Sequence, residues 1–565
     1  MTPKEQRVTP QGAFRDATHD VTNQPPPLED WNLFTSDTAL REAVAREGGT
    51  WGKERLQTYG ALCGGELQAA GFLANENRPV LKTHDRYGHR IDRVDFHPAW
   101  HRLMQAAIEH EIPSLPWTES RPGAHVVRSA LSYMHSQIEA GSGCPLTMTF
   151  AVIPALRHQP DVYAAWAPRI LSGEYDPAFR PAEQKRGLTL GMGMTEKQGG
   201  SDVRSNTTRA VPTGAGGPGG EYAITGHKWF FSAPMCDAFL VLAQAPKGIS
   251  CFLMPRWRPD GSLNSIHIQR LKDKLGNWSN ASSEVEFHAA HALLIGEEGR
   301  GVPVIIDMVM HTRLDCITGS AALMRQAVAQ AVHHCAHREA FGRRLIEQPL
   351  MQNVLADIAL ESEAAMLMSL RVSRALDDAR NNPQSAALAR IGTAVGKYWV
   401  CKRTPMLVNE AQESLGGAGY VEESILPRLY REAPLNSIWE GSGNVQCLDV
   451  LRALAREPEA LQAMQQEFAT ARGQHALLDQ AIDDLQAELA DHNDMEIRAR
   501  RLVEKMAVTW QAVLMQRTGN AAVFDAFCAS RLGHDRGRVF GTLPTGLPLK
   551  AIAERAQPLL ESGNN

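Results

Sequence analysis

The sequence predicts an α+β fold in which a helical domain, a β domain, a helical bundle domain and a C-terminal helical extension follow one another. Over residues 31–185 apolar side chains recur at helix spacing, as Leu103 and Ala107 do. Beyond Gly187 the chain breaks into short β-rich runs separated by turn-forming residues, which is typical of a small β domain. Helix spacing returns near Val302 and continues almost to the end of the chain.

Composition and charge exclude several classes of protein. Of the 565 residues, 43% are hydrophobic and 21% are charged, a mixture that excludes wholesale disorder. The formal net charge of −5 excludes a generally basic nucleic-acid binder, but it leaves room for a local basic face. The N-terminus has no apolar core of signal-peptide length, and no run of about 18 apolar residues exists. We therefore expect neither secretion nor contact with a membrane.

The cysteines and histidines predict neither disulfides nor a metal site. Nine cysteines are scattered singly between Cys63 and Cys528 with no C-x-x-C pair, so we expect reduced thiols in a cytoplasmic protein. His333, His334 and His337 share helix spacing, but no third ligand lies at a recognisable distance. We interpret these histidines as part of a half-buried subunit surface and expect no bound metal.

The changes of pattern divide the chain into segments. We expect strands over residues 222–232, 239–245, 249–255, 266–271 and 285–288, and long helices over 321–338 and 351–376. Apolar stripes at 461–468, 478–489 and 502–513 predict three amphipathic helices, and residues 524–532 predict a short fourth. The expected boundaries are an N-terminal extension (1–30), a helical domain (31–185), a β domain (186–300), a helical bundle domain (301–452) and a C-terminal helical domain (453–565).

A polar motif, MGMTEKQGGSD at residues 192–202, stands at the start of the β domain. Its adjacent glycines allow the backbone to approach a ligand closely, and its hydroxyls and free N–H groups suit an anion such as a pyrophosphate. A plain glycine turn is the alternative. A second glycine-rich run at 213–220 is followed by neither Gly-Lys-Ser/Thr nor a helix, so we interpret it as a hairpin tip.

Further motifs follow in a defined order. They are GHKWFFS (226–232), REAFG (338–342) with Gln348, LGGAGY (415–420), Pro427-Arg428 with Arg431, and WEGSGN (439–444). In this order and at these separations they resemble the acyl-CoA dehydrogenase family over about residues 90–450. The runs SNTTRA, KDKLGN, LPRLYRE and CLDVLR, and the extension after residue 452, are similar to one branch of that family, the alkylation-response flavoproteins.

The resemblance implies an acyl-CoA dehydrogenase-like fold, FAD as the cofactor, and a homotetramer. It places Phe230 along the isoalloxazine ring and Ser232 near its N5, and contacts of this kind tune a flavin. Arg338, Phe341 and Gln348 resemble residues that reach the adenosine end of an FAD held by a neighbouring subunit. The other implied cofactor contacts are Met192, Met194, Thr195, Gly200, Ser201 and Phe231 in the β domain, and Ile438, Trp439, Gly441, Ser442 and Asn444 in a loop that would close over the cofactor.

Glu440 matches the position of the catalytic base in many members of this family. Such a carboxylate removes the proton α to the thioester from the face opposite the flavin. The neighbouring residues depart from the family pattern, since Trp439 replaces the usual Tyr and Glu413 stands where many members carry Gln. Glu440 is therefore either an active base or a structural remnant. Arg452 is either a charge near the flavin or a helix-capping arginine.

The C-terminal segment carries a split charge. Residues 453–497 contain 2 basic and 10 acidic side chains, whereas residues 498–565 contain 10 basic and 5 acidic ones. A cluster of this kind suits phosphate contacts, and a solvated helix face or pairing with the acidic half is the alternative. No aromatic residues are interleaved to stack bases, so any binding should tolerate sequence. The candidate DNA contacts are Arg498, Arg500, Arg501, Lys505, Arg517, Arg531, Arg536 and Arg538.

Two functions follow, and they differ in their partner. The favoured hypothesis is an FAD protein that binds double-stranded DNA without strong sequence preference, responds to alkylation damage, and retains weak acyl-CoA dehydrogenase activity. The alternative is a plain acyl-CoA dehydrogenase with acyl-CoA as its substrate and a working Glu440. A third possibility is that the extension only builds an oligomer interface.

Overall fold

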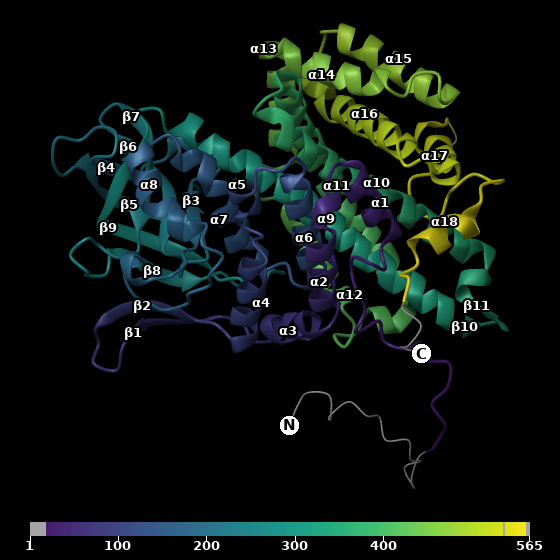
Figure 1. The fold of residues 1–565 in the computed structure, drawn as a ribbon, viewed down its shortest axis with the longest axis horizontal. Helices are drawn as coiled ribbons and strands as arrows, with labels where there is room; N and C mark the ends of the chain where they lie inside the picture. The colour runs from purple at the N-terminus through teal and green to yellow at the C-terminus, as the bar shows by residue number, and fades with distance from the viewer. Residues whose placement is uncertain (1–17, 535–536, 561–565) are drawn as a thin grey trace.

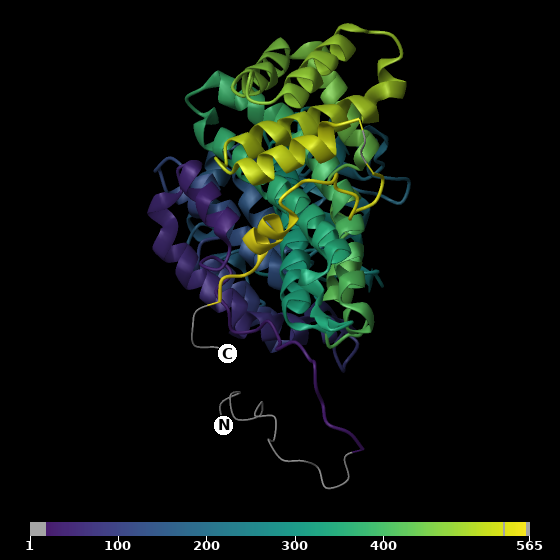
Figure 2. The same ribbon diagram turned by 90° about the vertical axis from the view of Figure 1, so that its right-hand side faces the viewer.

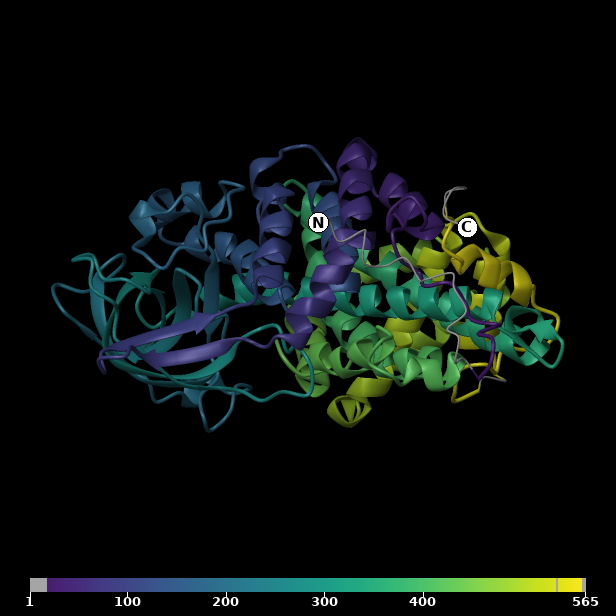
Figure 3. The same cartoon turned by 90° about the horizontal axis from the view of Figure 1, so that it is seen from below.

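The computed structural model describes residues 18–534 and 537–560, and Figure 1 shows their arrangement. The N-terminal part consists mainly of helices, with one hairpin that extends along the β domain (Figure 1 and Figure 3). The helices are α1 (Thr38–Arg46), α2 (Lys53–Gly64), α3 (Glu66–Glu76), α4 (Pro98–Glu109), α5 (Leu115–Thr118), α6 (Ala124–Ile138), α7 (Gly143–Leu156) and α8 (Pro160–Ile170). Strands β1 (Val80–His84) and β2 (Arg90–Asp95) form the hairpin.

This hairpin interrupts a segment that the sequence predicted to be helical throughout. Its turn is held by Asp85, whose carboxylate accepts hydrogen bonds from the backbone N–H groups of Tyr87 and His89, and by Gly88 at φ +86°. The hairpin lies along the β domain (Figure 3), where the Ile268 N–H donates to Asp92 Oδ1 at 3.1 Å. Its strands are largely exposed, so they lack the apolar alternation by which a strand is recognised in a sequence.

The β domain confirms the predicted strands. It contains β3 (Leu190–Gly193), β4 (Arg209–Pro212), β5 (Glu221–Ser232), β6 (Ala238–Ala245), β7 (Gly248–Pro255), β8 (Ile266–Leu271) and β9 (Ser282–Ile295). The sheet order is β3-β6-β4-β5-β9-β7 with β8 on β9, and a further β6–β7 pairing closes the circuit. The rings of Phe231, Phe239 and Phe287 pack inside this circuit, and each residue is at most 1% exposed.

Three long helices form the helical bundle: α9 (Gly301–His337), α10 (Pro349–Ala379) and α11 (Pro383–Ser414). Helix α9 begins against strand β7, because a Cβ on Gly301 would lie 2.4 Å from the carbonyl carbon of Ser250. From there the 37 residues of α9 extend about 55 Å at 1.5 Å per residue. Short strands β10 (Glu339–Ala340) and β11 (Arg343–Arg344) therefore lie at the end of the molecule opposite the β domain (Figure 1).

The C-terminal helices pack directly on this bundle. They are α12 (Leu426–Glu432), α13 (Gly443–Arg456), α14 (Pro458–Ala469), α15 (Ala476–Ala490), α16 (Met495–Gln516), α17 (Ala521–Phe527) and α18 (Leu549–Ala556). The predicted helices after residue 453 are thus confirmed, and Figure 2 shows them lying across the long helices. The indole of Trp510 is fully buried, and a Cβ on Gly392 would meet it at 2.7 Å, so the extension shares the core of the bundle.

Further features concern the described residues only. No helix among them is long and apolar enough to cross a bilayer. They contain no cluster of three or more His, Cys, Asp or Glu side chains arranged to hold a metal ion. All nine cysteines lie among them, and each is buried and outside any disulfide.

Candidate functional site

The glycine motif lies in a loop that leaves strand β3. Met192 is buried within the strand, Met194 and Thr195 are half-buried, and Ser201 is exposed. At Gly200 a Cβ would approach Thr195 Oγ1 to 2.3 Å, so a larger residue does not fit. Gly199 has φ +129° and no neighbour within 4 Å of its Cβ position, which leaves the backbone of this turn open to a ligand.

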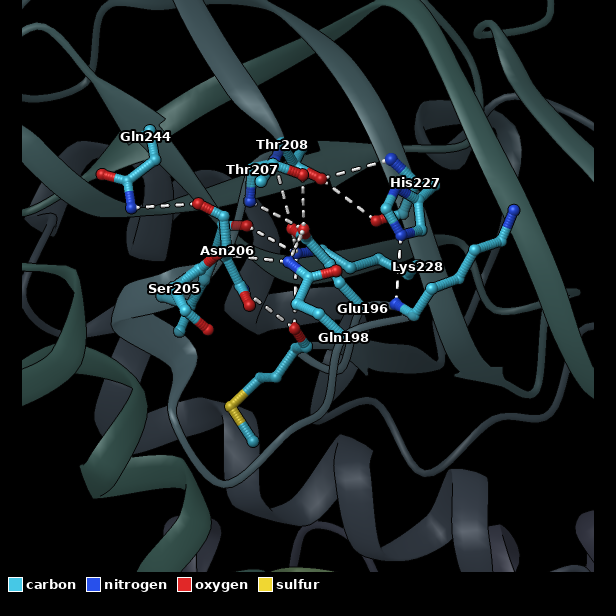
Figure 4. A network of polar contacts seen from close by, with 12 residues as sticks. Glu196, Gln198, Ser205, Asn206, Thr207, Thr208, His227, Lys228 and Gln244 are labelled. Atoms are coloured by element: carbon cyan, nitrogen blue, oxygen red, sulfur yellow. Dashed lines mark hydrogen bonds and ion pairs between the residues drawn. The ribbon is translucent and has the colours of Figure 1, made fainter.

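A buried ion pair holds this loop against the sheet (Figure 4). Glu196 and Lys228 are both fully buried, and Lys228 Nζ lies 2.9 Å from Glu196 Oε1. The Glu196 carboxylate also accepts hydrogen bonds from the backbone N–H groups of Thr207 (2.7 Å) and Thr208 (3.2 Å). Lys228 further donates to the carbonyl of Leu242 at 2.8 Å. These bonds join the two ends of the loop to strands β5 and β6.

The electrostatics of the pair follow from its burial. Burial acts to raise the pKa of Glu196, but the charge of Lys228 and the hydrogen bonds to the carboxylate outweigh it and hold that pKa at about 2. Burial lowers the pKa of Lys228 to about 8, against the attraction of Glu196. Glu196 and Lys228 are therefore both charged at neutral pH, and their attraction holds the glycine loop against the sheet.

At the end of strand β5, the side chains of consecutive residues point to opposite faces of the sheet. Phe230 is 49% exposed and Ser232 is half-buried, with its hydroxyl 3.2 Å from that of Ser282. The expectation that the Phe231 side chain contacts the cofactor is wrong, because that ring is fully buried in the β-domain core. The alternation of a strand explains the difference, since adjacent side chains point to opposite faces.

Glu440 lies in a tightly held loop between the short helix at 435–437 and α13. Its φ of +57° is unusual for a residue other than glycine, and Gly441 follows at +94°. Arg313 Nε and Gln446 Nε2 donate to the Glu440 carbonyl at 3.0 and 3.1 Å. The buried Lys397 ammonium donates to three other carbonyls of this loop, those of residues 436, 439 and 441, at 2.6 to 3.1 Å. A buried cation thus fixes the backbone that carries the candidate base.

The carboxylate of Glu440 has one side-chain donor among the described residues. Thr312 Oγ1 donates to Glu440 Oε2 at 2.7 Å, which leaves Oε1 to accept a proton. Burial raises the pKa of Glu440, and the Thr312 hydrogen bond and the charges of Lys397 and Arg313 oppose that rise. A raised pKa suits a base that acts near neutral pH.

The buried thiol of Cys144 relates Glu440 to the end of strand β5. Burial raises the pKa of Cys144 to about 12, the hydroxyl of Ser232 acts to lower it, and the charge of Glu440 acts to raise it. Ser232, which is expected near flavin N5, and the candidate base Glu440 therefore both influence the pKa of the Cys144 thiol. Trp439 packs against the β-domain core, and its indole N–H donates to Asn436 Oδ1 at 2.9 Å.

The rest of the base loop faces solvent. Ile438 is 64% exposed, and Ser442 and Asn444 are exposed as well. Asn444 Oδ1 accepts a hydrogen bond from Arg500 Nε at 2.8 Å, so a predicted cofactor contact touches a predicted DNA contact. Arg452 is paired with Asp449 at 3.5 Å.

Arg338, Phe341 and Gln348 are not near the glycine loop of their own chain. They surround the hairpin β10–β11 at the far end of α9 (Figure 1), where Gln348 Nε2 donates to the Ala340 carbonyl at 2.9 Å. The Phe341 ring is 97% exposed. Because the 37 residues of α9 lie between this hairpin and the β domain, these residues are far from the glycine loop of the same chain. Their role at a neighbouring subunit stays a prediction.

Most of the predicted DNA contacts are paired with acidic residues. Arg501 Nε lies 3.4 Å and Arg498 lies 3.9 Å from Glu488 of α15, and Lys505 binds the same carboxylate. Arg517 lies 3.2 Å from Glu467. Pairing with the acidic half was the alternative to phosphate contacts, and in the structure these four cations adopt it.

The remaining basic residues differ in exposure. Arg531 is largely buried between Asp357, at 2.5 Å, and Glu361, at 3.2 Å, so its assignment as a DNA contact is wrong, and it is a structural ion pair. Arg538 and Arg500 are exposed, whereas Arg536 lies outside the described residues. Burial and ion pairing of these residues depend on how α16 and α17 pack on other helices. Counting charges along the sequence gives no information about that packing.

Several residues of the site were missed by sequence reasoning. Thr312 and Arg313 lie in a long helix and have no motif of their own. Lys397 had a detectable signal, because it is a lone charge within the apolar run AVGKYWV at residues 394–400. A lysine buried in an apolar run requires acceptors, and here the base loop supplies them.

Comparisons with known proteins match successive parts of the chain to one family. Residues 23–177 match the model of the adaptive response protein AidB N-terminal domain, 191–290 the acyl-CoA dehydrogenase middle domain, and 299–455 its C-terminal domain. AidB of Escherichia coli (strain K12) is 47% identical over 90% of this chain and 94% of its own length. The chain belongs to the acyl-CoA dehydrogenase family, in its AidB group.

Solved structures share the fold. The crystal structure of Caenorhabditis elegans ACDH-11 in complex with C11-CoA has a TM-score of 0.82 and 25% identity, covering 98% of this chain and 96% of the other. The acyl-CoA dehydrogenase of Bacillus anthracis complexed with FAD has a TM-score of 0.62 and 17% identity, covering 76% of this chain and 81% of the other. The predicted acyl-CoA dehydrogenase-like fold is thus confirmed.

FAD is the cofactor that this family implies, and the residues present fit it. The turn at Gly199 has open space where a side chain would stand, so a pyrophosphate could approach its backbone closely. Phe230 and Ile438 expose apolar side chains on two elements that flank the site, and an isoalloxazine ring would cover such surface. A hydrogen bond from the Ser232 hydroxyl to a ring nitrogen stays a prediction of the family resemblance. When bound, FAD supplies the hydride acceptor of the reaction.

Proposed function

We propose that this protein is an FAD-containing homotetramer that associates with double-stranded DNA, acts in a response to alkylation damage, and has weak acyl-CoA dehydrogenase activity. The observation that carries the enzymatic part is the half-buried Glu440, held by Thr312 and by a clamped backbone. We place it in the cytoplasm because its nine cysteines are buried and unpaired.

In the proposed reaction Glu440 removes the proton α to the thioester. The Thr312 hydroxyl orients the carboxylate through Oε2, and Oε1 takes the proton. The clamp from Lys397 and Arg313 keeps the carboxylate from swinging toward solvent. Trp439 packs against the β domain beside the base, and this bulk supports a narrowed thioester site and slow turnover.

The DNA part of the proposal rests on the AidB group and on a reduced set of cations. Arg500, Arg501 and Arg538 remain exposed, and the Arg501 side chain is 70% exposed despite its contact with Glu488. Three cations per chain make a weak contact, which four copies in a tetramer would strengthen by raising the effective concentration. Binding through phosphates would be sensitive to salt and tolerant of sequence.

A plain acyl-CoA dehydrogenase is the second candidate, and two observations favour it. Glu440 is held as a working base would be, and Glu488 neutralises much of the basic cluster. Under this alternative an acyl-CoA turns over rapidly and DNA binding is negligible.

One preparation separates the two candidates. The FAD-loaded protein is assayed against a panel of acyl-CoAs with an artificial electron acceptor, beside Glu440→Gln and the exposed-surface control Glu459→Gln. We expect slow turnover that Glu440→Gln lowers by about 10² to 10⁴-fold and that the control leaves unchanged. Rapid turnover of any acyl-CoA supports the plain dehydrogenase, and unchanged activity in Glu440→Gln contradicts the assignment of the base.

The same preparation is titrated with duplex DNA over a salt series. Arg500→Ala with Arg501→Ala should weaken binding and lower the salt slope by about 0.9 for each phosphate that is no longer neutralised. Lys550→Ala, which removes another exposed cation of the extension, is the matched control. Equal binding by the double variant and the control contradicts the DNA surface.

A further inference from the structure

The segment that precedes the first helix runs across the far end of α9, beside the hairpin β10–β11. It is anchored at two points by side chains of the folded core. His333 Nε2 lies 2.9 Å from the Pro26 carbonyl, and Gln68 Nε2 donates to the Leu28 carbonyl at 3.2 Å. The sequence suggested only a polar extension here, but the described part from residue 18 is in contact with the predicted cofactor turn.

Asn23 makes that contact with three hydrogen bonds. Its Nδ2 donates to the Glu339 carbonyl at 2.9 Å, and its Oδ1 accepts from the Glu339 N–H at 2.8 Å. One amide group thus pairs with both polar groups of one residue, as a neighbouring strand would. The Asn23 carbonyl also accepts from Arg338 Nη1 at 2.5 Å. Asn23 has φ +55°, a conformation that asparagine adopts more readily than most residues.

The turn that Asn23 contacts requires such support. Strands β10 and β11 contain two residues each, and a hairpin this short is not stable alone. Phe341 and Gly342 form its tip at φ +53° and +77°, and an aromatic residue in that conformation is strained by roughly 1–3 kcal/mol. Gln348 secures one side of the hairpin through the Ala340 carbonyl. Asn23 secures the other side.

We propose that Asn23 is a positioning residue for the cofactor site of the neighbouring subunit: the N-terminal segment of one chain holds Arg338 and Phe341 in the conformation that receives the adenosine end of the partner's FAD. The inference rests on the proposed intersubunit role of Arg338. It assigns a function to the N-terminal segment, which makes no contact with the glycine loop of its own chain in the described residues.

The test measures the affinity of deflavinated protein for FAD by quenching of flavin fluorescence. Asn23→Ala removes the paired hydrogen bonds, and Asn23→Gly removes them while still favouring positive φ. Without these two side-chain hydrogen bonds, both variants should bind FAD about tenfold more weakly. Val21→Ala, an exposed residue of the same segment, is the matched control and should bind as the unaltered protein does. Thermal unfolding of the FAD-free variants should coincide with that of the control, because the hairpin is peripheral.

Arg338→Ala distinguishes the two levels of the argument. It should weaken FAD binding, and adding Asn23→Ala to it should weaken binding by less than tenfold more, because Asn23 acts on FAD binding in part through Arg338. If Arg338→Ala binds FAD normally, the intersubunit assignment fails, and the role of Asn23 fails with it. If Arg338→Ala binds weakly but both Asn23 variants bind normally, only the positioning role is overturned. Normal binding by Asn23→Gly with weak binding by Asn23→Ala would show that backbone conformation matters and would overturn the role of the amide.

Discussion

Removing Lys228 should destabilise the β domain far more than removing the whole ion pair to which it belongs. In Lys228→Met the Glu196 carboxylate stays fully buried without its cation, although the N–H groups of Thr207 and Thr208 still donate to it. Leaving one partner of a buried pair unpaired costs about 3–5 kcal/mol. The double variant Glu196→Gln with Lys228→Met buries no charge, and it should cost about 1–2 kcal/mol because fewer hydrogen bonds form.

The pKa values support this asymmetry. At neutral pH the fall in the pKa of Glu196 from 4.5 to about 2 contributes about 3 kcal/mol, which is lost as the pH falls from about 4.5 through 2. Burial lowers the pKa of Lys228 from 10.5 to about 8, so the charged lysine opposes folding at neutral pH. The cost of burying the two charges thus offsets the attraction between them, and the role of the pair is to hold the loop.

Urea unfolding followed by tryptophan fluorescence measures these free energies, and FAD content after gel filtration measures the effect on the loop. Both variants should lose FAD, but only Lys228→Met should lose several kcal/mol. If Lys228→Met unfolds no more easily than the double variant, the unpaired Glu196 carboxylate is not buried as the structure indicates, and the reasoning is refuted.

Three other predictions concern the base and the extension. Thr312→Val removes a hydrogen bond that lowers the pKa of Glu440, so the acid limb of the pH profile of kcat/KM should move to higher pH. If the acid limb does not move, the group that titrates there is not Glu440. Glu488→Gln releases the cations paired with it, so duplex DNA should bind severalfold more tightly at low salt, and unchanged affinity would exclude that face as the DNA surface. Arg531→Met leaves the buried Asp357 carboxylate without a cation, whereas Glu361 keeps Arg403 at 3.1 Å. The variant should therefore cost about 3–5 kcal/mol of unfolding free energy, and a changed salt slope of DNA binding would contradict the structural role of Arg531.

Much of the fold could be predicted from the sequence because its signals are local. Strands β5, β6 and β7 alternate or bury short apolar runs between turns, and the helices after residue 453 carry clear stripes. Hairpin β1–β2 was missed because its strands are exposed and its turn depends on Asp85. Of the candidate site, the order of the motifs predicted the glycine loop and Glu440.

The residues that act on those motifs could not be predicted in the same way. Thr312 meets Glu440 across 128 positions of sequence, and Asn23 meets Glu339 across 316. No spacing rule relates such pairs, because their proximity follows from how α9 packs against the elements beside it.

By itself the sequence determined the succession of helices and strands, the order of the family's motifs and the split charge of the extension, since each depends on neighbouring residues. Only the tertiary structure decided which charges are free. It placed Arg498 and Arg501 on Glu488, buried Arg531, and exposed Phe341 at the end of α9 that lies away from the β domain (Figure 1). The physical reason is that burial and charge pairing depend on which surfaces pack together, and long-range burial of apolar side chains selects those surfaces.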